Sequence, residues 1–414
     1  MSRPLRFCML TTFYPPYNFG GDGIFVQRLS NELAQRGHQV EVIHCLDAYH
    51  ILSSQEPAVT YKDHVNVTVH GLKSPFGFLS PLATQQTGFP LFKSSQIQKI
   101  LEKSFDVIHY HNISLLGGPK ILEFGQGIKL YTMHEYWLVC PTHILFRFNR
   151  APCTQPYCFA CTLTFKRPPQ WWRYTGLMKS AINHVDTFIA PSRFTKDKHL
   201  EIGLDKPIIH LPNFIPETDD TTSTLKETCY VKVPETPYFL FVGRLEKFKG
   251  LQTLFPVFDH YQRAQLLIAG KGSYEQRLRQ LSKGNNNIKF LGHMTSRQLQ
   301  ILFRKAIALI VPSLCFEMFP LVILEAFKEQ TPVIVRNLGG MPEPIEESGG
   351  GSIYNTDEEL VAIMDRLLAD PSYQGESGLH GYQAYQKNWT PRVHLKRYLS
   401  LIHEIATARG QRLD

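Results

Sequence analysis

Short apolar segments alternate with longer amphipathic segments along the chain, and the series starts again halfway. In the first half we expect strands at Leu5–Leu10, Val40–Cys45, Asp106–Tyr110, Lys129–Met133 and Phe188–Ala190. In the second half we expect strands at Tyr238–Val242, Gln265–Ala269, Ile288–Leu291, Ala308–Val311 and Pro332–Val335. Strands that alternate with helices usually pair in parallel, and helices then cover both faces of the sheet. The pattern therefore predicts an α/β protein with two parallel sheets.

The chain has 414 residues, which is enough for two domains of ordinary size. A polar, threonine-rich segment between the halves suits a linker. We therefore predict a Rossmann-like domain over 1–211, a linker over 212–236, and a second Rossmann-like domain over 237–388. The stretch 389–414 is expected to form a final helix, because its apolar residues from Leu395 to Ile405 follow helical spacing.

The composition is that of a globular protein, with 43% hydrophobic and 19% charged residues. No apolar run reaches membrane-spanning length, and the N-terminus lacks a signal-peptide layout, so we expect a cytoplasmic location. Lysine and arginine exceed the acidic residues by 44 − 36 = 8. This excess suits nucleotide diphosphates or an acidic membrane face, and no motif for nucleic-acid recognition accompanies it.

Two glutamates lie eight positions apart around the start of a predicted helix. Glu317 falls in the loop after the strand that ends near Val311, and Glu325 falls inside the helix that starts at Leu321. Ligands of open α/β sheets bind at this carboxyl end of the strands. Carboxylates there can accept hydrogen bonds from the hydroxyls of a polyol, so the pair indicates a sugar or ribose site.

Two cations follow the first strand of the second half. Arg244 and Lys249 lie in the segment Gly243–Gly250, where they can neutralise the charge of a diphosphate leaving group. The alternative is a basic surface loop without a ligand. A second glycine pair, Gly270 and Gly272, follows the next strand and lets backbone N–H groups approach a nucleotide, although a plain turn would look the same.

The first half has its own candidate residues after predicted strands. Gly20 and Gly21 precede the first helix and form an anion-binding turn, but not the Gly-x-Gly-x-x-Gly fingerprint of dinucleotide cofactors. His134 follows a strand and can hydrogen-bond a sugar, whereas the common alternative is a histidine satisfied in the core. Of the histidines in Asp106–His111, we interpret His109 as structural and His111 as facing an acceptor.

These motifs together resemble the family 4 glycosyltransferases, which have the GT-B fold. Gly243, Arg244, Lys249 and Gly250 match the family's Gly-Arg and Lys-Gly motif, and Leu291–Met294 and Gly339–Glu343 match two further segments. The resemblance implies two domains that face a cleft, with the last helix crossing back to the first domain. It also implies transfer of a hexosyl group from a UDP- or GDP-linked sugar to a hydroxyl of a glycan, a lipid-linked sugar or a small molecule, with retained anomeric configuration.

The resemblance also assigns roles to residues. Arg244 and Lys249 would stabilise the leaving group, Glu317 and His134 would hold the sugar, and Glu325 would hold the ribose. Because the departing phosphate would take the acceptor's proton, no catalytic metal is expected. The expected donor-binding residues are Gly20, Gly21, Gly243, Gly270, Gly272, Met294, Phe319, Leu321, Val322 and Glu325.

The chain departs from the family pattern at one donor position. Pro320 stands where the family has glycine, and proline has no backbone N–H to donate. One expected contact to the donor is therefore in doubt. Two alternatives stay open, a non-catalytic protein that binds nucleotide sugars on the same fold and a nucleotide-sugar epimerase.

Four of the eight cysteines lie close together in the sequence, at Cys140, Cys153, Cys158 and Cys161. Their spacing and the expected cytoplasmic location favour a structural metal site over disulfides, with zinc ahead of an iron–sulfur cluster. The alternative is an insertion over 140–165 with unpaired cysteines.

The segment Lys166–Tyr174 mixes cations with aromatic residues. It could rest peripherally on the inner face of a membrane and hold a lipid-linked acceptor there. The alternative is a helix packed on the first domain.

Overall fold

The computed structural model describes residues 3–57, 60–217, 222–223 and 233–413. The chain divides into two compact units. The first unit comprises Met1–His143, Cys158–Leu225 and Pro391–Asp414, and the second comprises Ile144–Tyr157 and Lys226–Thr390. Of the expected linker, residues 218–221 and 224–232 lie outside the described residues.

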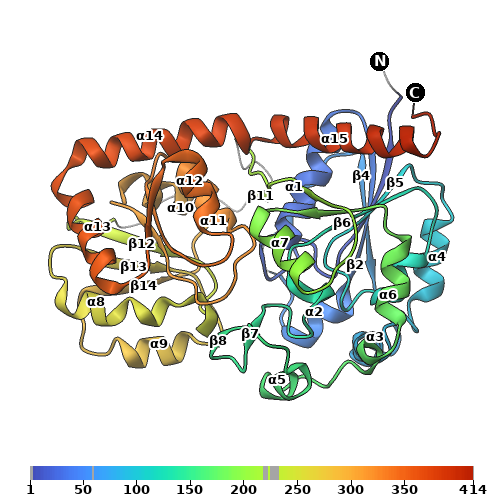
Figure 1. Ribbon diagram of the computed structural model, residues 1–414, viewed down its shortest axis with the longest axis horizontal. Helices are drawn as coiled ribbons and strands as arrows, with labels where there is room; N and C mark the ends of the chain where they lie inside the picture. The colour runs from blue at the N-terminus through green and yellow to red at the C-terminus, as the bar shows by residue number, and fades with distance from the viewer. Residues whose placement is uncertain (1–2, 58–59, 218–221, 224–232, 414) are drawn as a thin grey trace. The chain divides into compact units, whose positions relative to one another are not determined.

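The first unit is built on a parallel sheet with the strand order β10-β9-β6-β5-β1-β2-β4 (Figure 1). Its strands are β1 (Arg6–Leu10), β2 (Gln39–Cys45), β4 (Val67–Leu72), β5 (Val107–Tyr110), β6 (Ile128–Thr132), β9 (Thr187–Ala190) and β10 (Ile208–His210). A separate antiparallel pair joins β3 (Thr60–Tyr61) to β11 (Thr222–Ser223).

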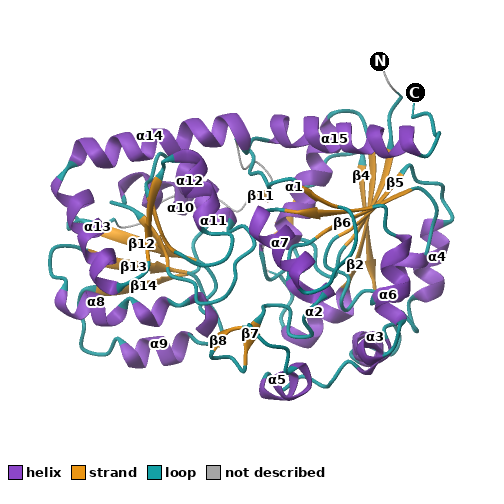
Figure 2. Cartoon of the chain, viewed as in Figure 1, coloured by secondary structure: helices purple, strands orange, loops and turns teal. Residues whose placement is uncertain are grey.

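Helices cover both faces of this sheet (Figure 2). The helices of the unit are α1 (Gly21–Gln35), α2 (Leu46–Leu52), α3 (Leu79–Thr87), α4 (Ser94–Leu101), α5 (Cys158–Thr164), α6 (Leu177–Ala181), α7 (Arg193–Glu201) and α15 (Pro391–Ala408), with short 3-10 turns η1 (Pro119–Glu123), η2 (Tyr136–Leu138), η3 (Trp171–Tyr174) and η4 (Ile182–His184). Alternate residues of β1 face opposite ways. Phe7 and Met9 pack with α1 and α15, whereas Cys8 and Leu10 pack with α4 and η1.

The second unit carries another parallel sheet, with the order β14-β13-β12-β15-β16-β17. Its strands are β12 (Tyr238–Val242), β13 (Gln265–Ala269), β14 (Ile288–Gly292), β15 (Leu309–Val311), β16 (Val333–Arg336) and β17 (Gly351–Tyr354). Its helices and turns are η5 (Lys247–Lys249), η6 (Leu251–Thr253), α8 (Phe255–His260), α9 (Glu275–Leu281), α10 (Ser296–Lys305), α11 (Leu321–Lys328), α12 (Pro342–Ser348), α13 (Asp357–Ala369) and α14 (Pro371–Asn388). A small hairpin of β7 (Phe146–Arg147) and β8 (Ala151–Pro152) groups with this unit.

The predicted α/β class and the two parallel sheets are confirmed, and each expected strand lies within two residues of an observed one. Three strands of these sheets were not expected, namely β4, β10 and β17. All three lie at the edge of a sheet. An edge strand can leave its side chains in solvent, as β4 does with half of its residues, so it lacks the apolar run that marks a central strand.

The last two helices belong to different units. α14 packs on α11, α12 and α13 in the second unit, and Trp389 at its end stacks on Phe327 with ring centroids 5.9 Å apart. α15 then joins the first unit, where it contacts α1 and β6. The expected return of the final helix to the first domain is confirmed. Within the described residues, no helix is both long and apolar enough to cross a membrane.

Buried histidines hold α15 against the first unit. His394 Nδ1 donates a hydrogen bond to the carbonyl of Pro212 at 2.8 Å, and the Tyr398 hydroxyl lies 2.9 Å from His109 Nδ1. Burial, opposed by the hydrogen bond to Pro212 and aided by the neighbouring Arg397 and His134, lowers the pKa of His394 from 6.5 to about 4. Burial therefore makes protonation of His394 unfavourable in the folded protein, although a protonated ring could still donate to Pro212.

We predict that acid weakens the first unit through His394. Because its folded pKa lies below 6.5, the unfolded chain binds the extra proton between pH 6.5 and about 4, and the free energy of unfolding falls as the pH falls through that window. At roughly 1.4 kcal/mol per pKa unit, the loss from His394 is about 3 kcal/mol. Urea unfolding of the wild type and of His394→Gln at several pH values should show a shallower pH dependence for the variant, whose amide can still donate to Pro212. If the free energy of unfolding depended on pH equally in both proteins, this explanation would be wrong.

Candidate functional site

The predicted donor residues of the second unit lie in loops at one edge of its sheet and in the first turns of α11. β12, β13, β15 and β16 are parallel neighbours or near neighbours, so their carboxyl ends meet at the same edge. The loops that leave this edge carry Gly243 to Gly250, Gly270 to Gly272 and Ser313 to Glu317. This is the edge at which open α/β sheets bind ligands.

Glycines let the loops after β12 and β13 touch at their backbones. A Cβ on Gly270 would lie 1.9 Å from the Gly243 carbonyl oxygen, and one on Gly272 would lie 2.4 Å from the Leu245 carbonyl oxygen. The Leu245 N–H donates to the Lys271 carbonyl at 3.0 Å. No other residue type fits these two positions without moving a backbone, because the obstacles are main-chain atoms.

Two further glycines bring the loops after β15 and β16 into the same group. Gly250 has φ +75°, and a Cβ there would lie 2.0 Å from the Pro312 carbonyl oxygen. Gly339 has φ +65°, and a Cβ there would lie 2.9 Å from both the nitrogen and the oxygen of Glu317. The Gly340 N–H donates to the Glu317 carbonyl at 2.7 Å. The backbone of Glu317 is thereby fixed by its neighbours.

The Glu317 carboxylate is held by groups from two loops. Its Oε1 lies 2.7 Å from Lys249 Nζ and accepts a hydrogen bond from Ser313 Oγ at 2.7 Å, and only 14% of the side chain is exposed. Burial alone would raise the pKa of Glu317, but Lys249, Ser313 and Arg244 outweigh it and the pKa is lowered. The carboxylate is therefore ionised at neutral pH, and its oxygens can accept hydrogen bonds from hydroxyl groups.

The other charged candidates lie near this pair. Arg244 is exposed, so its guanidinium can reach an anion from solvent. Pro320 caps α11 without a backbone N–H, and the amides of Leu321 and Val322 begin the helix. These are among the first N–H groups of a helix, which have no acceptor within the helix. Glu325 is half-buried one turn further along α11.

Two predicted donor residues differ in what they can offer. Phe319 is 9% exposed, and its ring lies 6.3 Å from that of Trp389, so its side chain belongs to the core and only its backbone can face a ligand. Met294 is half-buried in the loop after β14.

The predicted residues of the first unit gather at the carboxyl ends of β1, β5 and β6, which are adjacent strands. Gly20 caps α1 in an extended conformation, and Gly21 is the first residue of that helix. His111 follows β5 directly, and His134 lies two residues beyond β6.

The structure brings His111 and His134 together. His111 Nδ1 lies 2.9 Å from His134 Nε2, and the two rings stack with centroids 5.2 Å apart. His111 is 1% exposed, and its buried Nε2 has no hydrogen-bond partner among the described residues. Burial lowers the pKa of His134 to about 4 and that of His111 well below 6.5, so both rings are neutral at neutral pH. His109 is also buried and bonds Thr132, which agrees with its structural interpretation.

Sequence reasoning missed several polar residues at these sites. Asp22 lies in the first turn of α1 and accepts a hydrogen bond from Asn112 Nδ2 at 3.2 Å. Its charge opposes the lowering of the His134 pKa, which places it in the electrostatic surroundings of that ring. An acidic residue directly after Gly20 and Gly21 was the available signal. Ser313, which binds Glu317, gives no sequence signal beyond its place in the loop.

The predicted four-cysteine metal site is wrong. Among the described residues, no group of three or more His, Cys, Asp or Glu side chains could hold a metal ion. Cys158 and Cys161 lie on α5, whereas Cys153 follows β8 in the hairpin that groups with the second unit. Cys140 Sγ lies 3.2 Å from the Thr142 hydroxyl instead. The short spacing forms a helical turn, not a metal knuckle.

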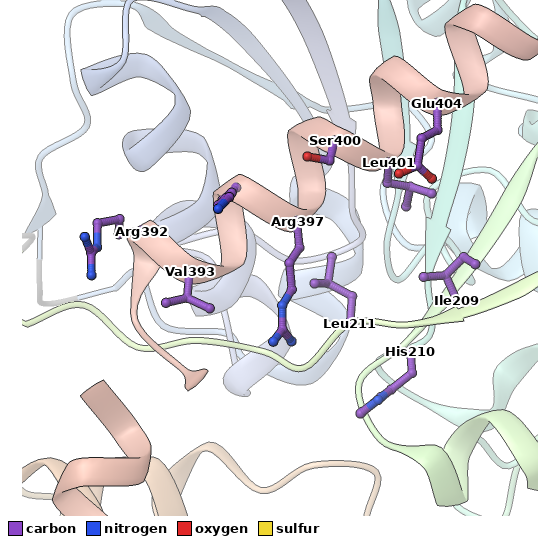
Figure 3. Close-up of a pocket in the computed structure, with 10 residues that line it drawn as sticks. Ile209, His210, Leu211, Arg392, Val393, Arg397, Ser400, Leu401 and Glu404 are labelled. Carbon is purple, nitrogen blue, oxygen red and sulfur yellow. The ribbon is translucent and has the colours of Figure 1, made fainter. Parts of the chain in front are cut away.

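A cavity of about 760 Å³ lies in the first unit between β10 and α15 (Figure 3). Arg392, Lys396 and Arg397 line it together with Glu404, and Arg397 points toward His210. Burial, followed by nearby cations including Arg397, lowers the pKa of His210 to about 4. The residues that line this cavity include none of the residues that the sequence assigns to donor or acceptor.

Two family models match the chain. The model for Glycosyltransferase Family 4 matches residues 19–219, and the model for Glycosyl transferases group 1 matches residues 229–383. An uncharacterized glycosyltransferase of Methanocaldococcus jannaschii is 25% identical over 398 residues, which cover 88% of this chain and 90% of that protein. The phosphatidyl-myo-inositol mannosyltransferase of Mycobacterium leprae is 23% identical over 366 residues, which cover 86% and 85%.

Solved structures share the fold at low identity. Sucrose-phosphate synthase from Thermosynechococcus elongatus has a TM-score of 0.73 at 18% identity and covers 98% of this chain and 100% of its own. HepE of Anabaena in complex with UDP has a TM-score of 0.64 at 15% identity, with 97% and 100% covered. The two family models follow one another along most of the sequence, and the fold agrees with them. The chain thus belongs to the group 1, family 4 glycosyltransferases, retaining GT-B enzymes that move a hexosyl group from a nucleotide sugar to an acceptor.

Proposed function

We propose that the loops around Glu317 are the donor site and that the donor is a UDP- or GDP-linked hexose. The observation that carries this is the ionised Glu317 carboxylate, which Lys249 and Ser313 hold at 2.7 Å among touching glycine loops. An ionised acceptor beside a cation, at the carboxyl edge of a parallel sheet, fits a ligand that carries hydroxyls and phosphates side by side.

Arg244 and Lys249 stabilise the leaving diphosphate. The bond between the sugar's anomeric carbon and the phosphate oxygen breaks, and the acceptor oxygen forms its bond to the same carbon from the same face. The acceptor's proton passes to the departing phosphate oxygen, so no protein base is required. The two cations balance the charge that develops on the diphosphate, and no divalent metal is needed for that. The backbone N–H groups of Leu321 and Val322 also donate hydrogen bonds to the diphosphate, whereas Pro320 has no N–H to donate.

Glu317 and His134 hold the transferred sugar, and Glu325 accepts hydrogen bonds from the ribose. Gly243, Gly270, Gly272 and the backbone of Phe319 allow the nucleotide to approach the main chain, and Met294 lies beside the base. Gly20 and Gly21, at the start of α1, are further proposed donor-binding residues.

The acceptor is a hydroxyl of a glycan, a lipid-linked sugar or a small molecule. A lipid-bound acceptor is supported by the likeness to the Mycobacterium leprae phosphatidyl-myo-inositol mannosyltransferase, and UDP by the likeness to HepE. Action at the inner face of a membrane would suit such an acceptor.

His111 acts through His134 as a positioning residue, not as a direct acceptor contact. One of the two neutral rings must donate the proton that they share at 2.9 Å. If His134 Nε2 donated, His111 would carry its own proton on the buried Nε2, which has no partner among the described residues. Donation from His111 Nδ1 leaves only an unused lone pair there, and a buried unpaired N–H is the rarer arrangement. His134 would then present Nδ1–H as a donor to a sugar oxygen.

A panel of nucleotide sugars tests the proposed reaction. Each donor is incubated with the protein, and release of the free nucleotide diphosphate is measured alongside the thermal midpoint. Release from one donor supports the proposal. A thermal shift without release would identify a binding protein instead, and an altered sugar still attached to the nucleotide would identify an epimerase.

We predict that Arg244→Ala and Lys249→Ala each lower kcat about a hundredfold or more, because each removes a contact to the developing charge. Lys247→Ala, a cation in the same loop, is the matched control and should stay within about twofold of wild type. Thermal midpoints check that the fold survives. Near-normal turnover in both site variants would contradict the assignment of Arg244 and Lys249 to the diphosphate.

Glu325→Ala and Glu317→Gln should separate binding from turnover. Ribose contacts persist from substrate to transition state, so Glu325→Ala should raise the donor KM by about tenfold with kcat nearly unchanged. Glu317→Gln should lower kcat, because its charge acts on the sugar as the glycosidic bond breaks. Equal effects of both substitutions on KM alone would contradict this division.

His111→Asn tests the positioning role, because its amide N–H can replace Nδ1–H, and His111→Leu cannot replace it. We expect Asn to keep most of kcat and Leu to lower it at least about tenfold, with donor KM little changed in both. The His134 signal in ¹⁵N-histidine spectra can be assigned by its loss in His134→Gln. It should show the Nδ1–H tautomer in the wild type. In His111→Leu, the preference for this tautomer should be lost. A His134 tautomer that stays the same in both variants would exclude the role even if the protein lacks transferase activity.

A further inference from the structure

Acidic residues are absent from two long stretches of the first half. None occurs in residues 64–101 or in residues 136–185, although the chain contains 36. Lysines occur in both stretches, and arginines occur in the second. Lys93 is buried beside Asp47, whereas exposed cations in stretches without acids are complementary to an anionic partner.

The same stretches expose large apolar side chains of the first unit. Phe78 is 64% exposed, Leu91 55%, Trp171 58% and Tyr174 62%. We call these and their exposed neighbours the apolar surface, whose members are Phe76, Phe78, Leu79, Leu82, Phe89, Leu91, Phe92, Phe159, Leu163, Trp171 and Tyr174. Single exposed apolar residues are ordinary, but a group this large marks an interaction site.

Hydrogen bonds and ring contacts make the surface continuous. Gln85 of α3 accepts a hydrogen bond on its carbonyl from the Trp172 indole at 2.9 Å, and its amide donates to the Pro168 carbonyl at 2.7 Å. These bonds join α3 to η3. The rings of Phe159 and Trp171 lie 5.9 Å apart, which adds α5. Figure 1 shows α3 and α5 at the same lower edge of the first unit.

The remaining part of the surface lies between α3 and α4. Phe76 before α3 and Phe92 before α4 pack with ring centroids 4.4 Å apart. The half-buried Arg173 of η3 donates hydrogen bonds to the Trp137 carbonyl at 2.5 Å and the Leu138 carbonyl at 3.4 Å, which fix η3 to the body of the unit. Trp171 and Tyr174 on either side of this anchor are therefore held outward by a rigid turn.

Exposed cations accompany the apolar residues. Lys73 precedes Phe76, Lys99 lies on α4, Lys166 precedes η3, and Lys179 lies on α6, which packs on η3. Aromatic and leucine side chains with lysines, in stretches that contain no acids, match the boundary of a bilayer, where rings sit at headgroup level and cations meet anionic lipids. A protein partner would also demand hydrogen-bond complementarity and would not require the absence of acids.

We propose that the apolar surface docks the first unit on an anionic lipid bilayer. Phe76, Phe78 and Leu91 enter the headgroup boundary together with Trp171 and Tyr174, and the lysines contact lipid phosphates. The docking extends the proposed function to an acceptor that is itself carried by lipid. It does not depend on the residues assigned to the donor.

Vesicle flotation with the full chain tests the docking. Phosphatidylcholine vesicles are compared with vesicles that contain roughly a third phosphatidylglycerol, and the wild type should float with the anionic vesicles and much less with the neutral ones. The double variant Phe78→Ser/Leu91→Ser and the single variant Trp171→Ser should each lower the bound fraction by at least about tenfold. Lys73→Gln/Lys166→Gln should weaken binding mainly at low salt.

The controls separate docking from other causes. Ile209→Ser and Leu281→Ser replace side chains that are 42% and 44% exposed outside the apolar surface, and they should float like the wild type. Lys249→Ala should also float like the wild type. The flotation result can therefore be interpreted even if the donor assignment is wrong. Equal flotation of surface and control variants overturns the proposal. So does a concentration-dependent dimer that Phe78→Ser abolishes, because a second copy would then be the occupant.

Discussion

The ionised carboxylate of Glu317 is the constraint on which the second unit's loops depend. A carboxylate removed from water costs several kcal/mol unless a cation and hydrogen bonds replace its hydration. Lys249 supplies the cation from the loop after β12, and Ser313 supplies a hydroxyl from the loop after β15. The two loops must therefore lie close together, and Gly250 makes this approach feasible because any Cβ would meet the Pro312 carbonyl.

The buried histidine network of the first unit is stabilised without charge. Its buried histidines are kept neutral and bonded to one another, to Thr132, to Tyr398 and to the Pro212 carbonyl. Neutral rings need no counter-charge, but each has only one proton to donate, so the network fixes which nitrogen carries it. The donor loops of the second unit thus present a fixed charge, and the histidine network of the first unit presents fixed proton positions.

How far the sequence could predict the structure depended on burial. Central strands such as β12 were placed to the residue because both faces are buried, whereas the edge strands β4, β10 and β17 gave no apolar run. The loop that carries Glu317 was placed correctly from the strand before it and the helix after it. The pairing with Lys249 and the burial of His111 depend on contacts between segments far apart in the chain, which no local pattern contains. The cysteine spacing misled because a two-residue gap also fits one turn of a helix.

The place of α15 in the chain sets an order for folding. Leu395, Tyr398 and Ile402 complete one hydrophobic face of the first unit's sheet, yet the whole second unit precedes them in the sequence. During synthesis, the apolar side chains of β1 and α1 on that face must wait until the second unit has emerged from the ribosome. The second unit can close its own core first, since domains generally fold as they are made. The first unit to be translated is in this way the last to be finished, and it needs protection from aggregation in the meantime.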